Sequence, residues 1–301
     1  MKLKSGKAMY SGRFDQYGLT GQQLEQLHNT LFSMLLDIKK ICEDNHIAYS
    51  LSGGTVLGAV RHGGFIPWDD DADVMMFRSE YEKFRKVVKQ EYSDTYTLAE
   101  PLEPGYIQKK PKLMLNHSVY TEVSSAGMPE RYNKVFIDIF LIENVPASPV
   151  ARKITGWVYN VAFIASALAA DYRYPSPVIL EKCKNDKELN QYYSLRRRLG
   201  GIFDHVFGMR FYLKICEKVS HSSKVTGWAA IPAGISYNRE VFKRSLYARL
   251  TEVDFNGVPF PVPKNYDKYL SNLYGDYMKL PPESDRQTHS TVEFSVDTAE
   301  S

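Results

Sequence analysis

The pattern of hydrophobic and polar positions predicts alternating helices and strands in the first half of the chain. Leucine and isoleucine recur at spacings of three and four over residues 20–44, which is typical of an amphipathic helix. A shorter helix is expected over 55–62, because Gly63 stands where a glycine commonly ends a helix. Short hydrophobic stretches typical of strands lie at 47–51, 74–77 and 134–142. This alternation indicates an α/β fold.

Further along the chain the pattern changes. Residues 1–145 form the predicted core, and residues 146–230 are mainly helical in pattern and are interpreted as an insertion. Residues 231–289 are rich in Pro and Tyr and form a C-terminal segment without a regular pattern. The last stretch, 290–301, is acidic and polar, so we expect it to be a disordered tail.

Two helices are predicted within the insertion. One covers 154–170, which carries no charged side chain, and the other covers about 195–219. A membrane-spanning helix needs about twenty apolar residues, and the first stretch is shorter and contains polar side chains. We therefore favour a buried helix. A helix lying on a bilayer is the open alternative, because Arg152 and Lys153 precede it.

Composition and charge narrow the class of protein. The chain is 44% hydrophobic and 24% charged, as soluble globular proteins are, and its formal net charge of +3 is too small to indicate a nucleic-acid partner. Cys42, Cys183 and Cys216 are far apart and odd in number, which favours reduced thiols over a disulfide framework or a zinc site. The N-terminus is basic but lacks the apolar run of a signal peptide. These features predict a cytoplasmic protein.

A cluster of carboxylates is the main candidate for chemistry. Asp69, Asp70, Asp71 and Asp73 fall within five residues and would repel one another unless a divalent cation supplied positive charge. The cluster leads directly into the buried strand predicted at 74–77. Side chains alternate along a strand, so Asp71 and Asp73 point the same way and could share Mg²⁺. A solvated acidic turn is the alternative interpretation, which the adjoining hydrophobic run disfavours.

Two glycines precede this cluster and suggest a phosphate site. Gly53 and Gly54 follow the strand predicted at 47–51, and a helix is expected to begin near Thr55. Backbone N–H groups at a helix N-terminus can face a phosphate, and glycine leaves room for its approach. A glycine pair alone is usually a turn. Combined with a downstream Asp-x-Asp, it predicts a nucleotide phosphate held beside a metal ion.

These motifs resemble those of a known family. The segment LSGGTVLGAVRHGGFIPWDDDADVM at 51–75 is similar to the signature of the LicD family, the bacterial phosphocholine transferases related to fukutin-type phosphotransferases. FIDIF at 136–140 resembles the family's strand with a third carboxylate. The similarity continues in YDKYL at 266–270 and YGDYM at 274–278. Matching blocks therefore cover roughly 45–145 and 250–290, while the helical middle matches nothing named.

The resemblance implies a fold, a reaction and partners. The fold would be a nucleotidyltransferase-like mixed sheet core with a mainly helical insertion, whose active site the segment 231–289 completes. The reaction would transfer phosphocholine from CDP-choline to a cell-envelope glycan, a teichoic acid or a lipooligosaccharide, and release CMP. The cofactor would be Mg²⁺, with Mn²⁺ as an alternative. Acceptors of this kind are often lipid-linked, so contact with the inner face of the membrane is a further expectation.

The resemblance also assigns roles to residues. Asp71 and Asp73 match the family's metal-binding pair, and Asp138 matches the third carboxylate, which completes the metal site and helps to activate the attacking hydroxyl. Asp69 and Asp70 are not assigned individually, and one of them could support the metal ligands from behind or form a turn. The residues expected on the donor phosphates are Gly53, Gly54, Thr55, Lys112, Arg286 and His289.

Two other functions stay open at this stage. The same fold could transfer another phospho-alditol or phospho-sugar, such as ribitol phosphate from CDP-ribitol, or it could be a non-catalytic scaffold of glycan assembly. Choline would need an aromatic cage for its quaternary ammonium, for which Tyr237, Tyr274 and Tyr277 are candidates. The complete set of three carboxylates argues against an idle scaffold.

Overall fold

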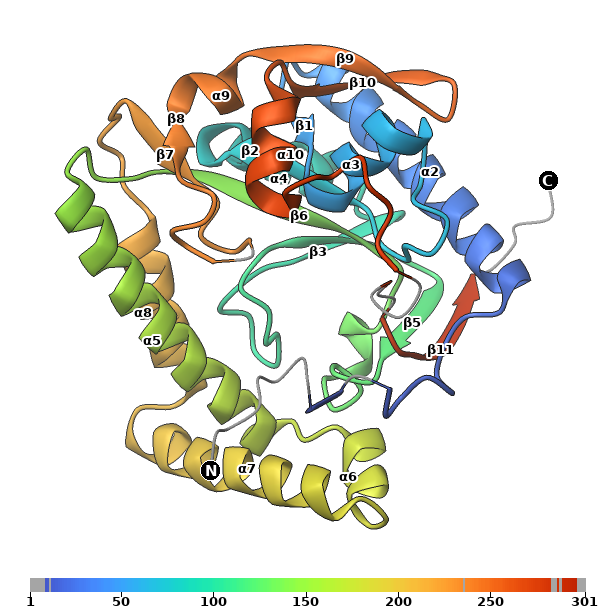
Figure 1. Ribbon diagram of the computed structural model, residues 1–301, viewed down its shortest axis with the longest axis vertical. Helices are drawn as coiled ribbons and strands as arrows, with labels where there is room; N and C mark the ends of the chain where they lie inside the picture. Colours follow the sequence, from blue (N-terminus) through green and yellow to red (C-terminus); the bar gives the residue numbers. More distant parts are fainter. Residues whose placement is uncertain (1–8, 11, 235, 283–285, 287–288, 297–301) are drawn as a thin grey trace.

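The computed structural model describes residues 9–10, 12–234, 236–282, 286 and 289–296. Its centre is a mixed sheet with the strand order β1-β2-β6-β4-β3, which β7 and β8 extend from β6 (Figure 1). The strands of this sheet are β1 (Ser50–Leu51), β2 (Asp73–Phe77), β3 (Tyr96–Ala99), β4 (Lys112–Leu115), β6 (Phe136–Asn144), β7 (Trp228–Ala230) and β8 (Phe242–Lys243). The expected α/β class with a mixed sheet is confirmed.

The register of three strands aligns polar side chains across the middle of the sheet. β2 and β6 are parallel, with Asp73 opposite Asp138, and β4 is antiparallel to β6, with Lys112 opposite Asp138. Residues directly opposite one another on neighbouring strands project from the same face. Asp73, Asp138 and Lys112 therefore form a row on one face, although they come from distant parts of the chain.

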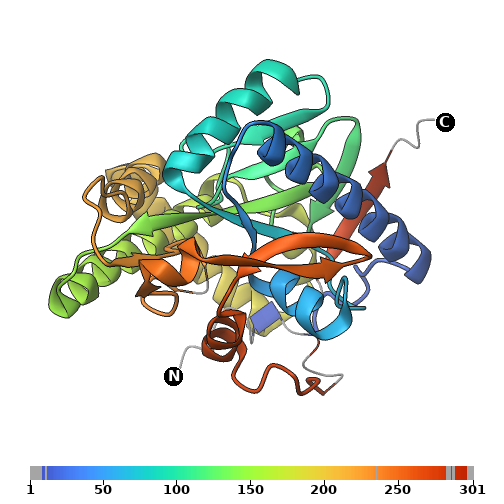
Figure 2. The ribbon, with the colours of Figure 1, turned by 90° about the horizontal axis from the view of Figure 1, so that it is seen from above.

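Helices cover both faces of the sheet (Figure 2). One face packs against α2 (Gly21–Asp44) and α4 (Arg78–Glu91), and the other carries α3 (Gly53–His62) and α10 (Tyr266–Tyr274). The helix predicted over 20–44 is confirmed, and its spaced apolar residues are buried in the main core: Leu27, Leu31, Leu35 and Ile38. α3 begins two residues earlier than expected and ends at Gly63 in the left-handed conformation, as predicted.

The C-terminal part of the chain is more regular than its sequence indicates. It contains α9 (Arg244–Ala248), a hairpin of β9 (Leu250–Phe255) and β10 (Val258–Pro263), and α10. The disorder expected from residue 290 is wrong for Thr291–Val296, which forms β11 and pairs with β5 (Ser118–Glu122). This polar segment is ordered by backbone pairing with a strand far away in the sequence, which composition does not reveal. The rest of the expected tail, 297–301, lies outside the described residues.

Four helices occupy the region interpreted as an insertion: α5 (Pro149–Arg173), α6 (Pro177–Cys183), α7 (Lys187–Val206) and α8 (Met209–Ser220). The single helix expected over 195–219 is wrong, because the chain breaks between α7 and α8. Gly208 has a φ of 79°, which a right-handed helix cannot contain, and the Asp204 side chain accepts from the N–H of Met209 at 3.2 Å. α5 packs against both α7 and α8.

Candidate active site

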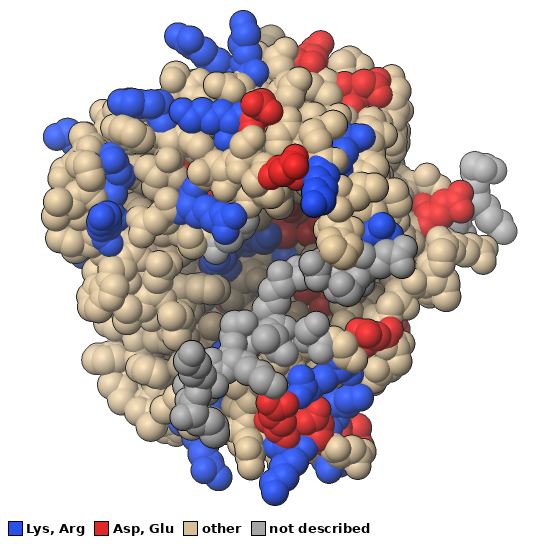
Figure 3. Space-filling view, in the orientation of Figure 1, with Lys and Arg blue, Asp and Glu red and all other residues tan. Residues whose placement is uncertain are grey.

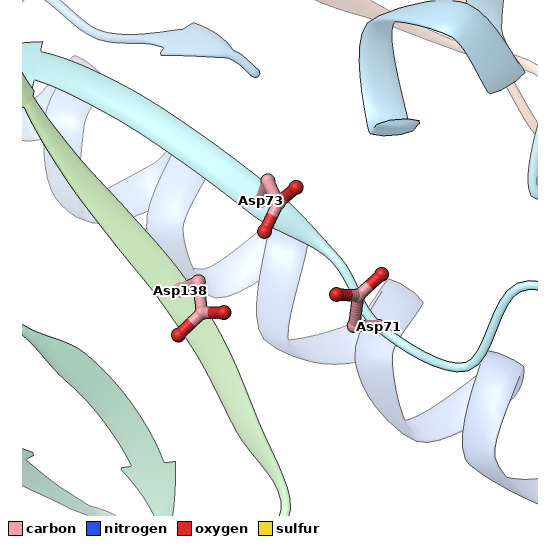
Figure 4. A group of neighbouring side chains, drawn as sticks. All are labelled: Asp71, Asp73 and Asp138. Carbon is pink, nitrogen blue, oxygen red and sulfur yellow. The ribbon is translucent and has the colours of Figure 1, made fainter. Parts of the chain in front are cut away.

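Three carboxylates converge at the N-terminal end of β2. Asp71, Asp73 and Asp138 each offer an oxygen, and these oxygens lie within 4.8 Å of one another (Figure 4). Asp73 begins β2, Asp138 lies beside it on β6, and Asp71 comes from the segment that leads into β2. The parallel register brings together two carboxylates that the sequence separates widely. The distances suit a divalent cation, because carboxylates bind Mg²⁺ at about 2.0–2.1 Å.

These carboxylates sit in a setting that disfavours their charge. Asp73 is 9% exposed and Asp138 is 4% exposed, and the Oδ1 atom of each is buried without a hydrogen-bond partner among the residues that the structure describes. Burial, and then the neighbouring carboxylate of Asp71, raises the pKa of Asp73 well above its usual range. Burial likewise raises the pKa of Asp71. A hard cation would satisfy both the bare oxygens and the crowded charges, so the residues fit a metal ion.

Lys110 lies at the carboxylates and was missed in the sequence. Its Nζ forms an ion pair with Asp138 Oδ2, and the charges of Asp138 and Asp73 raise the pKa of Lys110 although burial opposes it. Lys112 Nζ is farther from Asp138, at 3.9 Å from Oδ1, and lies 3.1 Å from the centre of the Phe136 ring. The sequence signal was present, because Lys110 and Lys112 alternate around Pro111 and so approach the same face.

The two glycines lie against the carboxylates, where a larger residue would have to displace an aspartate side chain. Gly53 has a φ of 48°, and a Cβ atom there would lie 3.0 Å from Asp73 Oδ2. A Cβ atom on Gly54 would lie 3.0 Å from Asp69 Oδ2. The N-terminus of α3 is thus held close to the acidic cluster, and its partial positive charge faces that cluster. Their predicted contact with a phosphate stays a prediction.

Thr55 connects α3 to β2. Its side chain is buried, and its Oγ1 accepts from the backbone N–H of Asp73 at 2.8 Å. The backbone N–H of Ser52 donates to the carbonyl of Asp73 at 3.0 Å, which fixes the same residue from the other side. Thr55 therefore positions a carboxylate in this structure, and the phosphate contact predicted for it remains untested.

Asp70, whose role stayed open in the sequence analysis, anchors the C-terminal segment. His289 donates to it twice, from its backbone N–H to Oδ2 at 2.8 Å and through Nδ1 to Oδ1 at 2.7 Å, and the Tyr120 hydroxyl donates to Oδ2 at 3.2 Å. Burial opposes the charge of His289, but the bond to Asp70 raises its pKa well above the usual range. Both of these His289 donors are thus engaged with protein, so a contact of His289 with donor phosphate stays a prediction.

The remaining candidates are divided between the site and its surroundings. The Arg286 guanidinium lies 4.4 Å from the centre of the Trp68 ring, and Trp68 directly precedes the acidic cluster in the sequence. Tyr274 reaches the site, because its hydroxyl would be 3.7 Å from a Cβ on Gly53. The Tyr277 hydroxyl instead donates to Asp267 at 2.9 Å.

The expected role of Tyr237 is wrong. It is fully buried and packs against Tyr159 of α5, with 5.7 Å between the ring centres. It belongs to a small hydrophobic cluster between α5, α8 and β7, so it cannot line a pocket beside the carboxylates. Its position in a tyrosine-rich sequence gave no sign of this.

A mixed sheet that brings three carboxylates together at two of its inner strands, beside a helix that begins with two glycines, defines a nucleotidyltransferase-type domain. Comparison with known sequences agrees. The family described as "LicD/FKTN/FKRP, nucleotidyltransferase domain" matches residues 46–147.

The relatives extend this similarity to most of the chain. It is 31% identical over 262 residues to the lipopolysaccharide cholinephosphotransferase LicD of Haemophilus influenzae, covering 85% of this chain and 91% of that protein. The chain belongs to the LicD family, as the resemblance predicted. Shorter similarities link it to uncharacterized proteins of Rickettsia typhi, 36% identical over 61 residues and 20% of each chain, and of Rickettsia prowazekii, 33% identical over 70 residues, 23% of this chain and 26% of that protein.

Proposed function

We propose that this protein is a metal-dependent transferase that moves phosphocholine from CDP-choline to a cell-envelope glycan and releases CMP. Two observations support the proposal together. The chain is similar over most of its length to a cholinephosphotransferase that acts on lipopolysaccharide, and it brings together two buried carboxylates and one half-buried carboxylate in an arrangement suited to a divalent cation. A scaffold without catalytic function would have no use for three crowded carboxylates, two of which hold a buried oxygen without a hydrogen-bond partner in the described residues, because burying such groups costs stability.

Each residue of the site has a role in this reaction. Asp71, Asp73 and Asp138 would hold Mg²⁺, or Mn²⁺, which when bound would neutralise the donor phosphates and assist departure of CMP. Asp138 Oδ1 has no hydrogen-bond partner among the described residues, so it can also accept the proton of the attacking hydroxyl. Lys110 holds the opposite oxygen of Asp138 and thereby orients it.

The transfer balances with these groups alone and the donor. The hydroxyl oxygen of the glycan bonds to the phosphorus of phosphocholine, and its proton passes to the carboxylate. The bond from that phosphorus to the CMP oxygen breaks, and CMP leaves with the bonding electron pair. The N-terminus of α3, where Gly53 and Gly54 leave the backbone accessible, would bind the phosphates of the donor.

The identity of the transferred group is tested by competition. CDP-choline and CDP-ribitol are supplied together with a purified envelope glycan and Mg²⁺, CMP release is measured, and the modified glycan is weighed by mass spectrometry. Phosphocholine as the main adduct supports the proposal, and ribitol phosphate would replace it with the alternative cargo. Absence of CMP release with either donor would point to a scaffold. Parallel reactions with a chelator, Mg²⁺ or Mn²⁺ test the metal requirement.

A further inference from the structure

The helix α5 is apolar on two opposite sides, and one of them has no partner over residues 150–164 within the described part of the chain. Its inner side packs into the protein, where Tyr159 and Ala162 join a core cluster. The outer side carries large hydrophobic side chains at spacings of four and three, so they form one stripe along the helix. These residues are between 48% and 67% exposed: Val150, Ile154, Trp157, Val161 and Ile164.

A second stripe lies on α7 and continues into α8. Its residues are spaced four, three and four apart and then meet Phe207 and Phe211, whose rings stack with 4.7 Å between their centres. All of them are at least 40% exposed: Leu195, Leu199, Ile202, Val206, Phe207 and Phe211. The two stripes hold 11 of the 18 large hydrophobic side chains that are exposed in the described residues, so this surface is a concentrated patch.

The two stripes face the same side of the molecule. Leu168 and Tyr172 continue the outer stripe of α5, and α7 crosses the helix there, with Gly200 against the carbonyl of Leu168 and Gly201 against the Tyr172 ring. The apolar side chains of α7 lie on the side of that helix turned away from these glycines. They therefore point outward in the direction of the α5 stripe. We call the two stripes together the α5–α7 face.

Charges around the α5–α7 face are positive. Lys153 on α5, Arg198 on α7, and Arg210 and Lys214 on α8 are exposed beside the hydrophobic side chains. The acidic residues of these helices are neutralised by ion pairs. Asp171 pairs with Arg196 at 2.6 Å and Asp204 with Arg173 at 2.9 Å, and the more exposed Glu188 and Glu217 pair with Arg13 and Arg78. Figure 3 shows Lys and Arg gathered at the end of the molecule where α5 begins, above a surface of mostly uncharged residues.

We propose that the α5–α7 face binds the surface of an anionic lipid bilayer. Hydrophobic side chains, Trp157 and the two phenylalanines among them, would enter the boundary of the acyl chains, and the flanking cations would meet lipid phosphates. A second copy of the chain fits less well, because it would bring the same positive margin against itself. This inference does not depend on which group the active site transfers.

The helix lies on the bilayer in this proposal and does not cross it. α5 has the length and hydropathy of a membrane span, but 44% of its most apolar window is buried inside the protein. Spanning would expose that inner side and detach Gly156 from Tyr237 and Asn238, against which it packs without space for a Cβ. The expectation of a fully buried helix is thus wrong for the outer side of α5, and the alternative of a helix on a bilayer becomes the proposal.

Sedimentation of the full chain with vesicles tests the proposal. Wild type should bind vesicles of phosphatidylglycerol and phosphatidylcholine. A double variant, Ile154→Glu with Ile202→Glu, should bind these vesicles with an affinity lower by about tenfold or more. Leu36→Glu on α2 is the matched control, because Leu36 is also an exposed hydrophobic residue and should bind as wild type does. Circular dichroism and CMP release on a soluble acceptor should be the same for all three proteins. Equal vesicle binding by the double variant and wild type would overturn the proposal.

Two further experiments test the flanking cations and the alternative that a second copy of the chain covers the α5–α7 face. Lys153→Glu with Arg210→Glu should lower binding to anionic vesicles several-fold, and wild type should bind pure phosphatidylcholine weakly. Equal affinity of wild type for anionic vesicles and for pure phosphatidylcholine vesicles would contradict the role of the cations. If wild type fails to bind vesicles and is a dimer in light scattering, while the double variant of Ile154 and Ile202 is a monomer, the face is a protein interface and the proposal is wrong.

Discussion

Replacing Asp73 by Asn should separate two effects of the carboxylates, the loss of stability from crowded charges and the binding of a metal ion. The variant keeps the size of the side chain and the start of β2, but removes one charge from a group whose oxygens lie within 4.8 Å of one another. Burial and Asp71 raise the pKa of Asp73 in the metal-free protein, so holding this carboxylate ionised there costs stability. We expect the metal-free variant to be as stable as wild type or more stable, and no longer to respond to a divalent cation.

The expected size of the metal response follows from mass action. A cation at a hundred times its dissociation constant stabilises the folded protein by about 2.7 kcal/mol, which corresponds to a rise in Tm of about 5 °C in a chain of this size. Two unit charges 4 Å apart attract each other by roughly 4 kcal/mol at an effective dielectric constant near 20. A divalent ion bound directly to a carboxylate lies closer, so losing one charged ligand should weaken binding of the cation about a thousandfold or more. At the same concentration the Asn variant should therefore show almost no rise in Tm.

The effect of pH has a definite sign. A carboxyl group with a raised folded pKa favours folding less as pH rises from the ordinary Asp range through the folded value, because the unfolded chain releases its proton more easily. Asn does not titrate. The stability advantage of the metal-free Asp73→Asn variant over wild type should therefore be absent at low pH and grow towards neutral pH.

Thermal unfolding and CMP release decide the outcome. Tm is measured with Mg²⁺ and with a chelator, at acidic and neutral pH, for wild type, Asp73→Asn and the control Asp44→Asn, whose carboxylate is exposed and pairs with Lys40. The control should retain both the metal response and activity. If Mg²⁺ raises the Tm of Asp73→Asn as much as that of wild type, or if this variant is fully active, the assigned metal site is refuted.

Three further changes test the surroundings of the site. Lys110→Met should destabilise the metal-free protein by about 2 kcal/mol in urea unfolding, since it leaves Asp138 with only the more distant Lys112, and an unchanged midpoint would contradict that role. Gly54→Val should leave the protein folded but weaken CDP-choline binding at least about tenfold in calorimetry, because its side chain would enter the space beside Asp69, and unaltered affinity would remove Gly54 from the site. His289→Ala should cost about 2 kcal/mol through the lost Nδ1 bond to Asp70, because only the backbone N–H bond is retained. That loss should be full below the ordinary His pKa and shrink as pH rises through the raised folded value, so a pH-independent loss measured by unfolding would argue against a charged His289.

Local patterns in the sequence were sufficient for the elements that carry the carboxylates. The spacing of apolar residues predicted α2, the hydrophobic runs predicted β2 and β6, and Gly63 predicted the end of α3. Each of these signals lies within a few residues, so no knowledge of the fold is needed to read it. The contiguous motif from 51 to 75 then identified the family, which similarity over most of the chain confirmed.

Partners at long sequence separation could not be found in this way. The register of β4, β6 and β2 aligns Lys112 with Asp138, and Lys110, just before β4, pairs with the same carboxylate. That register depends on which strands pair. The bonds of His289 to Asp70 exist only because β11 pairs with β5, although composition predicted disorder there. Burial of Tyr237 likewise follows from the docking of α5.

The sequence by itself thus determined the family, the α/β class and the three candidate carboxylates, because these depend on short motifs. Tertiary structure decided how those carboxylates meet, which lysine neutralises them and which helix faces remain exposed. The outer side of α5 illustrates the difference, since its stripe has the same period as a buried one. Period shows that a helix has an apolar side, but only the packing of the other helices determines whether the protein itself covers it.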